Sequence, residues 1–272
     1  MIADGLLKDV NEYSNIEQMA IQDISQDSWD EFYKHNQDKF FKNRNYLTFA
    51  FDLINQRIQE LKEGGKLNLF EVGSGTGNTI MPLHERYNKQ INFYACDFSH
   101  NAVKLLQSQG ICQKAFVKDM VTEELHEFDQ EEIINEENKQ QQIIPEIKLD
   151  FVTMIFFLSA IHPQEHKNVV QKLADRMNLG GVILFRDYGL FDLAMMRFIK
   201  KKKGIIDLQQ MIFQRGDKTL ACFFTMEQII KAMKESGLEC ISQDYCTIET
   251  KNIKRELTMR RVFINAIFQK VQ

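Results

Sequence analysis

The chain has 272 residues, of which 44% are hydrophobic and 26% are charged, and its formal net charge is −4. These values are typical of an ordinary globular protein, and the length suits one sizeable α/β domain with additions rather than two full domains. It contains no run of 18 apolar residues and no basic segment that leads into an apolar core, so we expect neither a membrane span nor a targeting peptide.

The first informative segment, residues 29–51, combines aromatic and basic side chains. It holds the only Trp of the chain and seven other aromatic residues, interleaved with Lys34, Lys39, Lys42 and Arg44. One interpretation is an amphipathic helix that packs against a sheet. A second, compatible interpretation is that the aromatic rings close over a cationic ligand while the basic residues bind a nucleic acid. We assign residues 1–60 to an N-terminal helical extension that covers a cofactor and contributes to nucleic-acid binding, and residues 61–272 to the main domain.

The next segment combines a strand, a glycine-rich turn and a distant acid. The expected strand Leu67–Val72 runs into Gly73, Gly75 and Gly77, and the expected strand Ile91–Cys96 ends at Asp97. Glycines let the backbone approach a ligand closely, and an acid at that place accepts hydrogen bonds from two ribose hydroxyls. The segment therefore predicts a nucleoside pocket, and a glycine-rich turn without a ligand is the alternative.

The glycine spacing indicates which nucleoside is bound. A dinucleotide fingerprint, G-x-G-x-x-G, holds a pyrophosphate at a helix N-terminus, but Asn78 stands where that pattern requires its third glycine. Glu71 adds an anion that would repel a pyrophosphate. A phosphate-free ligand with a cationic end fits better, and S-adenosylmethionine is such a ligand. The string E-x-G-x-G-x-G resembles the first motif of class I methyltransferases.

Farther along the chain, strand patterns alternate with helical ones. Strands are expected at residues 115–117, 150–156 and 182–186, and helices at residues 78–87, 101–109 and 165–177. This alternation is typical of a doubly wound sheet. A helix at residues 226–236 precedes two strands, 239–248 and 261–268, with no helix between them. This ending resembles that of class I S-adenosylmethionine-dependent methyltransferases rather than that of a dinucleotide dehydrogenase. The resemblance implies an α/β, Rossmann-like fold with a C-terminal antiparallel hairpin and an N-terminal helical extension.

Charge is concentrated between residues 123 and 150. This stretch holds ten Asp or Glu and two Lys, so the rest of the chain carries a net charge of +4. Residues 123–144 are rich in Glu, Gln and Asn with little apolar periodicity, which predicts a solvated insertion or mobile loop at about residues 123–148. A partner-binding arm is the alternative. The mildly basic remainder is compatible with a nucleic-acid substrate.

Several uncommon strings point to one family. They are WDEFY at residues 29–33, FFKNR at 40–44, FYACDFS at 93–99, IFFLSAIHP at 155–163, LFRDYG at 184–189, RGD with a Thr at 215–219 and RRVF at 260–263. In this order they resemble the tRNA 3-methylcytidine methyltransferases of the methyltransferase-like family, from about residue 28 to the C-terminus. Departures at Asn43, Lys218 and Leu220 leave the cofactor motifs unchanged but affect the expected substrate-side loop.

The resemblance and the motifs together imply a cofactor site and a tRNA site. The residues expected at S-adenosylmethionine are Trp29, Tyr33, Glu71, Gly73, Gly75, Asp97, Phe98, Asp119 and Ile155. The residues expected at tRNA are Lys42, Arg44, His162 and Arg215. For His162 the alternative is a turn residue that satisfies backbone groups. The run Lys200–Lys203 is a further candidate for contact with tRNA phosphates, and its alternative is a solvated loop.

Arg186 and Asp187 are the candidate catalytic pair, because they follow a strand at the edge where such sheets bind ligands. Asp187 would accept a hydrogen bond from the cytosine amino group, and Arg186 would bind the carbonyl or a phosphate. A buried ion pair between them is the alternative.

The resemblance implies that cytosine N3 attacks the sulfonium methyl group directly, on an unpaired base of the tRNA anticodon loop. Some members of the family rely on a seryl-tRNA synthetase as a helper, and the sequence leaves this open. Two alternatives remain: a methyltransferase that acts on a protein or small molecule, and a non-catalytic tRNA-binding relative.

The cysteines argue against a metal centre. The five are odd in number and include no C-x-x-C pair, so we expect neither a zinc site nor a disulfide framework. Reduced thiols suggest an intracellular compartment. We therefore expect a cytoplasmic protein and leave the nucleus open as a second location.

Overall fold

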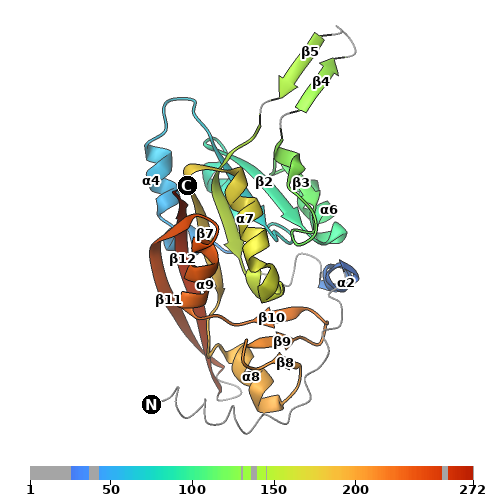
Figure 1. Ribbon diagram of the computed structural model, residues 1–272, viewed down its shortest axis with the longest axis vertical. Helices are drawn as coiled ribbons and strands as arrows, with labels where there is room; N and C mark the ends of the chain where they lie inside the picture. The colour runs from blue at the N-terminus through green and yellow to red at the C-terminus, as the bar shows by residue number, and fades with distance from the viewer. Residues whose placement is uncertain are drawn as a thin grey trace.

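A computed structural model describes residues 26–36, 43–129, 131–135, 140–144, 146–252 and 257–271. In this part of the chain a seven-stranded sheet has the order β11-β12-β7-β6-β1-β2-β3 (Figure 1). The strands β1, β2, β3, β6 and β7 are parallel, whereas β12 runs antiparallel to both β7 and β11. The bounds are β1 Leu67–Val72, β2 Ile91–Asp97, β3 Lys114–Val117, β6 Leu149–Ile155, β7 Met177–Tyr188, β11 Leu238–Asn252 and β12 Leu257–Lys270.

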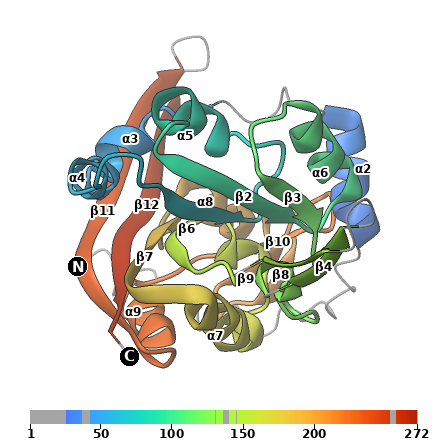
Figure 2. The ribbon, with the colours of Figure 1, turned by 90° about the horizontal axis from the view of Figure 1, so that it is seen from above.

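Helices cover both faces of this sheet. Figure 2 shows α3, α4 and α5 on one face, α7 and α9 on the other, and α2 beside α6. Their bounds are α2 Gln26–Asn36, α3 Leu47–Ala50, α4 Leu53–Gln59, α5 Ile80–Tyr87, α6 His100–Ser108, α7 His166–Arg176 and α9 Met226–Lys234. The expected doubly wound α/β fold with a C-terminal antiparallel hairpin is confirmed.

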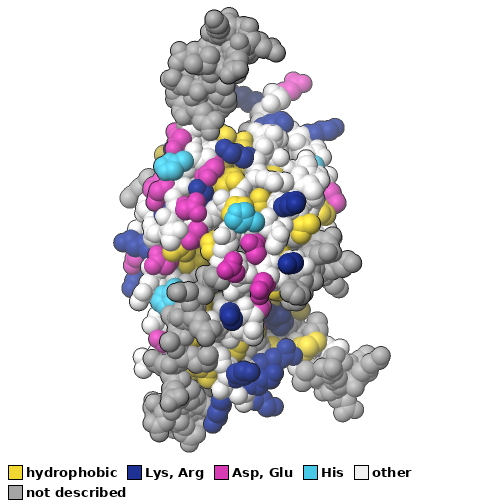
Figure 3. Space-filling model, turned by 90° about the vertical axis from the view of Figure 1, so that its right-hand side faces the viewer, with side chains coloured by type: hydrophobic (Ala, Val, Ile, Leu, Met, Phe, Trp, Pro, Cys, Tyr) yellow, Lys and Arg dark blue, Asp and Glu magenta, His cyan; other side chains and the backbone are white. Residues whose placement is uncertain are grey.

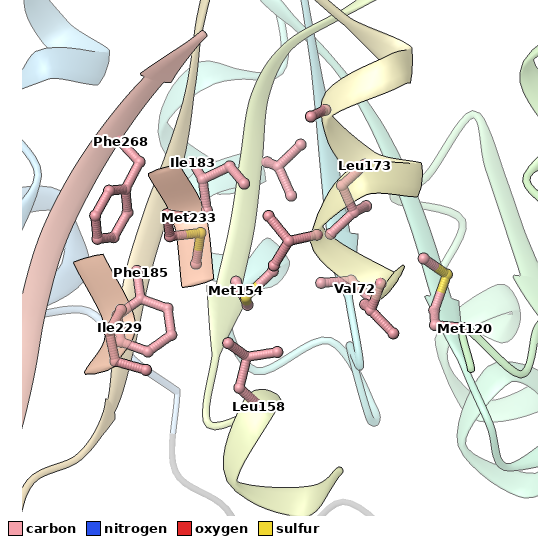
Figure 4. Packing of buried hydrophobic residues seen from close by; sticks show 14 of the residues in the cluster. Val72, Met120, Met154, Leu158, Leu173, Ile183, Phe185, Ile229, Met233 and Phe268 are labelled. Carbon is pink, nitrogen blue, oxygen red and sulfur yellow. The ribbon is translucent and has the colours of Figure 1, made fainter. Parts of the chain in front are cut away.

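Two hydrophobic cores result from the alternation of strand side chains. In β1, Leu69 packs with the α3–α5 side, whereas Phe70 and Val72 pack with the α7–α9 side. Figure 4 shows the second core, in which Leu173 of α7 and Met233 of α9 lie over the strands. Both faces of the sheet are buried, so alternate residues of a strand contribute side chains to opposite cores.

A smaller layer lies beyond the carboxyl edge of the sheet. Helix α8 (Leu193–Lys201) packs on a three-stranded sheet of β8 (Ile205–Asp207), β9 (Ile212–Gln214) and β10 (Leu220–Cys222). Met195, Phe213 and Phe223 belong to its own hydrophobic cluster. No sequence pattern above predicted this layer, because its strands have only three residues each.

The solvated insertion or mobile loop expected at about residues 123–148 contains regular structure in the part that the structure describes. A short helix, η1 (His126–Phe128), precedes an antiparallel hairpin of β4 (Glu131–Asn135) and β5 (Gln140–Ile144), which projects from the body (Figure 1). Phe128 is fully buried, with its ring centroid 5.1 Å from that of Phe70. One buried aromatic ring thus anchors a polar segment in which strand pairing satisfies the backbone groups.

None of the described helices has both the length and the apolar character needed to cross a membrane.

Candidate functional site

A cavity of about 890 Å³ opens at the carboxyl edge of the parallel strands. Cofactor and ligand pockets typically measure about 300–1,000 Å³, so this one has room for a nucleoside-sized ligand and a second group. One wall comes from α2, the turn after β1 and the ends of β2 and β3. The opposite wall comes from the ends of β6, β7, β11 and β12 and the loop after β9.

The glycine turn after β1 forms the floor of the first wall. Gly73 and Gly75 have φ angles of 65° and 55°, which other residues rarely adopt. A Cβ atom on Gly75 would lie 2.5 Å from the Tyr33 hydroxyl, and one on Gly73 would lie 2.5 Å from the Phe157 ring. Both glycines therefore line the cavity at positions that exclude any side chain.

Asp97 lies at the end of β2, directly beside this turn. Its Oδ2 accepts a hydrogen bond from the Gly75 amide at 2.7 Å, and its Oδ1 accepts one from the Ser99 amide at 2.9 Å. Burial raises the pKa of Asp97 to about 6, and the two amides oppose that shift. A carboxylate has about four acceptor positions. Since Asp97 lines the cavity, it can also accept hydrogen bonds from a ligand.

Helix α2 covers the turn with aromatic rings. Trp29, Phe32 and Tyr33 all line the cavity, and the rings of Trp29 and Tyr33 are stacked with centroids 6.1 Å apart. Burial, followed by the nearby Asp97, raises the pKa of Tyr33 well above its usual value. These rings present apolar, electron-rich faces to a ligand, which suits a cation.

Three other expected cofactor residues also line the cavity: Phe98, Asp119 and Ile155. The Asp119 carboxylate already accepts hydrogen bonds from the Val121 amide at 2.9 Å and the Thr122 hydroxyl at 2.7 Å. Asp119 can still accept a donor from the cavity, because each carboxylate oxygen has two acceptor positions.

Glu71 does not reach the cavity. It is fully buried, and its Oε1 lies 3.7 Å from the Arg44 Nη1. Burial raises the pKa of Glu71 to about 8, and the Arg44 charge opposes this shift. The expected cofactor contact is therefore not observed. The reason is strand alternation, which points Glu71 to the same face as Leu69, beneath the glycine turn.

Arg44 was expected at tRNA but lies on the cofactor side. Its Nη1 donates to the Thr79 hydroxyl at 2.8 Å, and its amide donates to the Asn78 carbonyl at 2.9 Å. Arg44 lines the cavity and is mostly buried, so its charge is not exposed to phosphates on the surface. Its two hydrogen bonds join the N-terminal extension to the segment after the glycine turn. Lys42 lies outside the described residues.

Arg186 lies at the centre of the second wall. It is buried between two rings, with its Cζ 4.7 Å from the Tyr46 centroid and 4.5 Å from the Phe263 centroid. Its Nη1 donates to Asn265 at 2.5 Å, while its buried Nε has no partner among the described residues. Arg186 lines the cavity, so its guanidinium places a positive charge in this wall.

Asp187 points to the opposite face of the sheet and does not line the cavity. Its Oδ2 accepts from the Ser159 amide at 2.9 Å and its Oδ1 from the Tyr188 amide at 2.8 Å. Burial raises the pKa of Asp187 to about 6. Since successive strand residues alternate, only Arg186 of the expected pair lines the cavity. Asp187 instead holds the loop that begins with η2 (Leu158–Ala160).

His162 and Arg215 line the cavity as expected for the substrate side. The His162 Nδ1 accepts from the Gln164 amide at 3.3 Å and thereby caps η3 (Pro163–Glu165), which agrees with the turn alternative. Arg215 donates to the Thr219 hydroxyl at 3.2 Å, with its Cζ 6.0 Å from the centroid of the Tyr188 ring.

Several residues of the second wall were not singled out from the sequence. Phe156 has a φ angle of 57°, a conformation that costs a non-glycine residue about 1–3 kcal/mol and often marks functional sites. The Nε of Arg261 donates to Asp192 at 2.7 Å, and its Cζ lies 5.0 Å from the Phe263 centroid. The family strings contain these residues, but only the pairing of β12 with β7 brings Phe263 beside Tyr188.

Comparisons with known proteins agree with this site. Residues 35–243 match the family model described as a methyltransferase domain. The tRNA N(3)-cytidine methyltransferase METTL6 of Rattus norvegicus is 35% identical, over 98% of this chain and 87% of the rat protein. The tRNA N(3)-methylcytidine methyltransferase trm141 of Schizosaccharomyces pombe is 32% identical, over 91% of this chain and 93% of its own. O-methyltransferase 3 of Dictyostelium discoideum is 30% identical, over 92% of this chain and 71% of its own.

Among solved structures, a SAM-dependent methyltransferase from Methanosarcina mazei has a similar fold. It aligns with a TM-score of 0.55 and 15% identity, over 80% of this chain and 97% of the other. At this identity the likeness supports the fold alone.

Proposed function

The chain belongs to the family of tRNA N(3)-cytidine methyltransferases, and from this premise we propose that it methylates N3 of an unpaired cytosine in a tRNA anticodon loop. The observation that carries the proposal is one cavity with two unlike walls. A glycine turn with Asp97 forms one wall, and Arg186 between aromatic rings forms the other. The first suits a nucleoside cofactor, and the second suits a planar base.

The cofactor wall fits S-adenosylmethionine. Gly73 and Gly75 leave room for a ligand against the backbone, and Asp97 has acceptor positions for ribose hydroxyls. Asp119 would accept from an adenine amino group. Two carboxylates in this wall disfavour a pyrophosphate, whereas Trp29 and Tyr33 present ring faces to a cationic sulfonium.

The chemistry requires little of the protein. S-adenosylmethionine supplies a methyl group bound to a sulfonium: the N3 lone pair forms the new N–C bond, the S–C electron pair returns to sulfur, and the positive charge passes to the base. Because no proton is removed, no general base is needed. The protein contributes by alignment, which can lower a barrier by about 7–11 kcal/mol.

The second wall would hold the cytosine. N3 lies on the Watson–Crick edge, so the base has to be unpaired and turned into the cavity. Tyr46, Tyr188 and Phe263 line the cavity and would pack against the base, and the Arg186 guanidinium would donate to the base carbonyl or a phosphate.

A basic surface beside the cavity would bind the rest of the tRNA. Arg197 and Lys200–Lys203 are exposed on α8 and the turn after it. Figure 3 shows Lys and Arg side chains gathered at this end of the molecule. Such a patch binds phosphates without reading sequence. Since the whole chain is acidic, we also propose that a helper protein, such as a seryl-tRNA synthetase, supplies tRNA selectivity.

A second candidate function is methyl transfer to a small molecule or protein, which the similarity to the Dictyostelium O-methyltransferase favours. The cofactor wall would serve this reaction equally well. The two candidates differ in the acceptor that the second wall binds.

The deciding experiment is mass spectrometry of nucleosides from tRNA that has been incubated with the purified protein and methyl-labelled cofactor. We expect the label in 3-methylcytidine, within fragments from the anticodon loop. Label that enters proteins or metabolites but not tRNA would support the second candidate. A parallel reaction with Arg186→Ala shows whether the label depends on this site.

A further inference from the structure

The Asp30 carboxylate of helix α2 contacts the first turn of α6. Asp30 Oδ1 accepts hydrogen bonds from the Ser99 hydroxyl at 2.5 Å and from the Asn101 amide at 3.2 Å. In return, the Asn101 side-chain amide donates to the Asp30 carbonyl at 3.2 Å. These contacts lie in the first turn of α6, where free backbone amides and the helix dipole favour a negative charge.

The Asp30 carboxylate is linked to the cofactor wall through one residue, Ser99. Ser99 donates its amide to Asp97 and its hydroxyl to Asp30, so a single residue links the expected ribose acceptor to α2. The link continues in α2 itself, because Tyr33 lies directly over Gly75. Neither Asp30 nor Ser99 lines the cavity, so any effect of Asp30 on a ligand acts through these neighbours.

Helix α2 has further polar contacts with the body. Gln26 donates to the Phe98 carbonyl at 2.7 Å, and the exposed His100 ring lies 3.8 Å from Asp30 Oδ2. The aromatic rings of α2 face the cavity, so a ligand in the cavity adds to their packing. Asp30 is thus a charged contact between α2 and α6.

We propose that Asp30 is a positioning residue whose contacts with Ser99 and Asn101, called the latch below, hold α2 over the cofactor. The latch thereby sets the rate at which S-adenosylmethionine and its product S-adenosylhomocysteine leave. The proposal rests on the proposed cofactor site. By linkage, a ligand that is held by Asp97 and covered by α2 strengthens the latch, and the latch strengthens ligand binding by the same factor. Loss of the latch raises the dissociation rate without altering the wall that holds the base.

The test measures release of S-adenosylhomocysteine by stopped-flow fluorescence. Trp29 is the only Trp of the chain and lies on α2, so its emission reports the latch directly. We expect Asp30→Ala to raise the dissociation rate and the cofactor KM about tenfold, as charge-assisted hydrogen bonds are lost. The kcat at saturating cofactor should not fall. Asp30→Asn should give an intermediate effect, because its amide oxygen still accepts but carries no charge.

Two further variants separate a latch from general damage. Asp27→Ala removes an exposed acid in the first turn of α2 and should leave release unchanged. Asn101→Ala breaks the latch from the side of the body, and its effect should be less than additive with that of Asp30→Ala, because the two residues share contacts.

Unchanged release in Asp30→Ala, or full additivity with Asn101→Ala, overturns the proposal. So does an equal effect of Asp27→Ala, which would indicate a loss of helix stability. If Asp30→Ala fails to fold, the release rate of Asp30→Asn decides. Failure of the unaltered protein to bind S-adenosylhomocysteine would instead contradict the proposed function.

Discussion

The two walls of the cavity are built in different ways. The cofactor wall depends on backbone geometry within a short stretch, from the glycine turn to Ser99, with α2 placed over it. The second wall, which we call the base wall, depends on side chains that are far apart in the sequence. Arg186 lies there between the rings of Tyr46 and Phe263. A local motif therefore builds the wall that we propose for the cofactor, whereas the strand pairing of the whole sheet builds the wall that we propose for the base.

If the walls are separate, Asp97→Ala should abolish cofactor binding and spare tRNA binding. The change removes the ribose acceptor, and hydrogen bonds to a charged group are worth about 1.5–3 kcal/mol each, so affinity should fall by at least about 100-fold. Calorimetry with S-adenosylmethionine measures this loss. Unchanged affinity would refute the assignment of this wall.

Arg186→Ala should have the opposite effect: it should reduce turnover and spare cofactor binding. Turnover should fall about 100-fold, as is usual when one preorganised donor is removed, while cofactor affinity stays within error. Arg186→Lys should not restore activity, because an ammonium cannot stack between two rings as a guanidinium does. Single-turnover methylation and calorimetry on the same samples separate the two effects. A parallel loss of cofactor affinity would mean that the walls are not independent.

Asp187→Ala tests whether Asp187 supports the structure while its strand neighbour Arg186 faces the cavity. The variant leaves the buried amides of Ser159 and Tyr188 without acceptors, so stability should fall by about 1–3 kcal/mol. Denaturant unfolding measures this change. A turnover loss with full stability would restore Asp187 to the role that the sequence suggested.

Glu71→Gln should change the pH dependence of stability. Because burial raises the pKa of Glu71 to about 8, the folded state retains a proton that the unfolded state has lost. The stability of the ligand-free protein should therefore fall as pH rises from about 5 to about 8, and the variant should reduce this slope. Melting temperatures across this range provide the measurement, and equal slopes for both proteins would contradict it.

The smallest effect is expected at the basic surface beside the base wall. Lys200→Gln together with Lys201→Gln should weaken tRNA binding a few-fold and reduce its salt dependence, because each lost phosphate contact lowers the slope by about 0.7–0.9. Binding titrations at several salt concentrations measure both. Methylation of free cytidine-containing oligonucleotides should be affected less than that of tRNA.

Much of the cofactor wall could be predicted from the sequence. Gly73, Gly75, Asp97 and the rings of α2 line the cavity, and the family resemblance is confirmed by 35% identity over 98% of the chain. Such features are local, so spacing is enough to reveal them. Glu71 was the exception, because only its place on a buried strand face shows that it lies beneath the turn.

The base wall could be predicted only in part. Arg186 was identified, but Asp187 was placed beside it although adjacent strand residues face opposite ways. Arg261 and Phe263 were missed because an aromatic or basic residue in an apolar strand also fits a core or a surface. Their functional position follows from the antiparallel register of β12 on β7, which pairs Phe263 with Tyr188.

The central claim is that this cavity joins a methyl group to N3 of a tRNA cytosine. The most direct measurement is nuclear magnetic resonance of the product formed from ¹³C-methyl S-adenosylmethionine and tRNA that carries ¹⁵N at cytosine N3. A one-bond coupling between the methyl carbon and N3 is the predicted result. A labelled methyl group without that coupling, on another atom or another molecule, would contradict the claim.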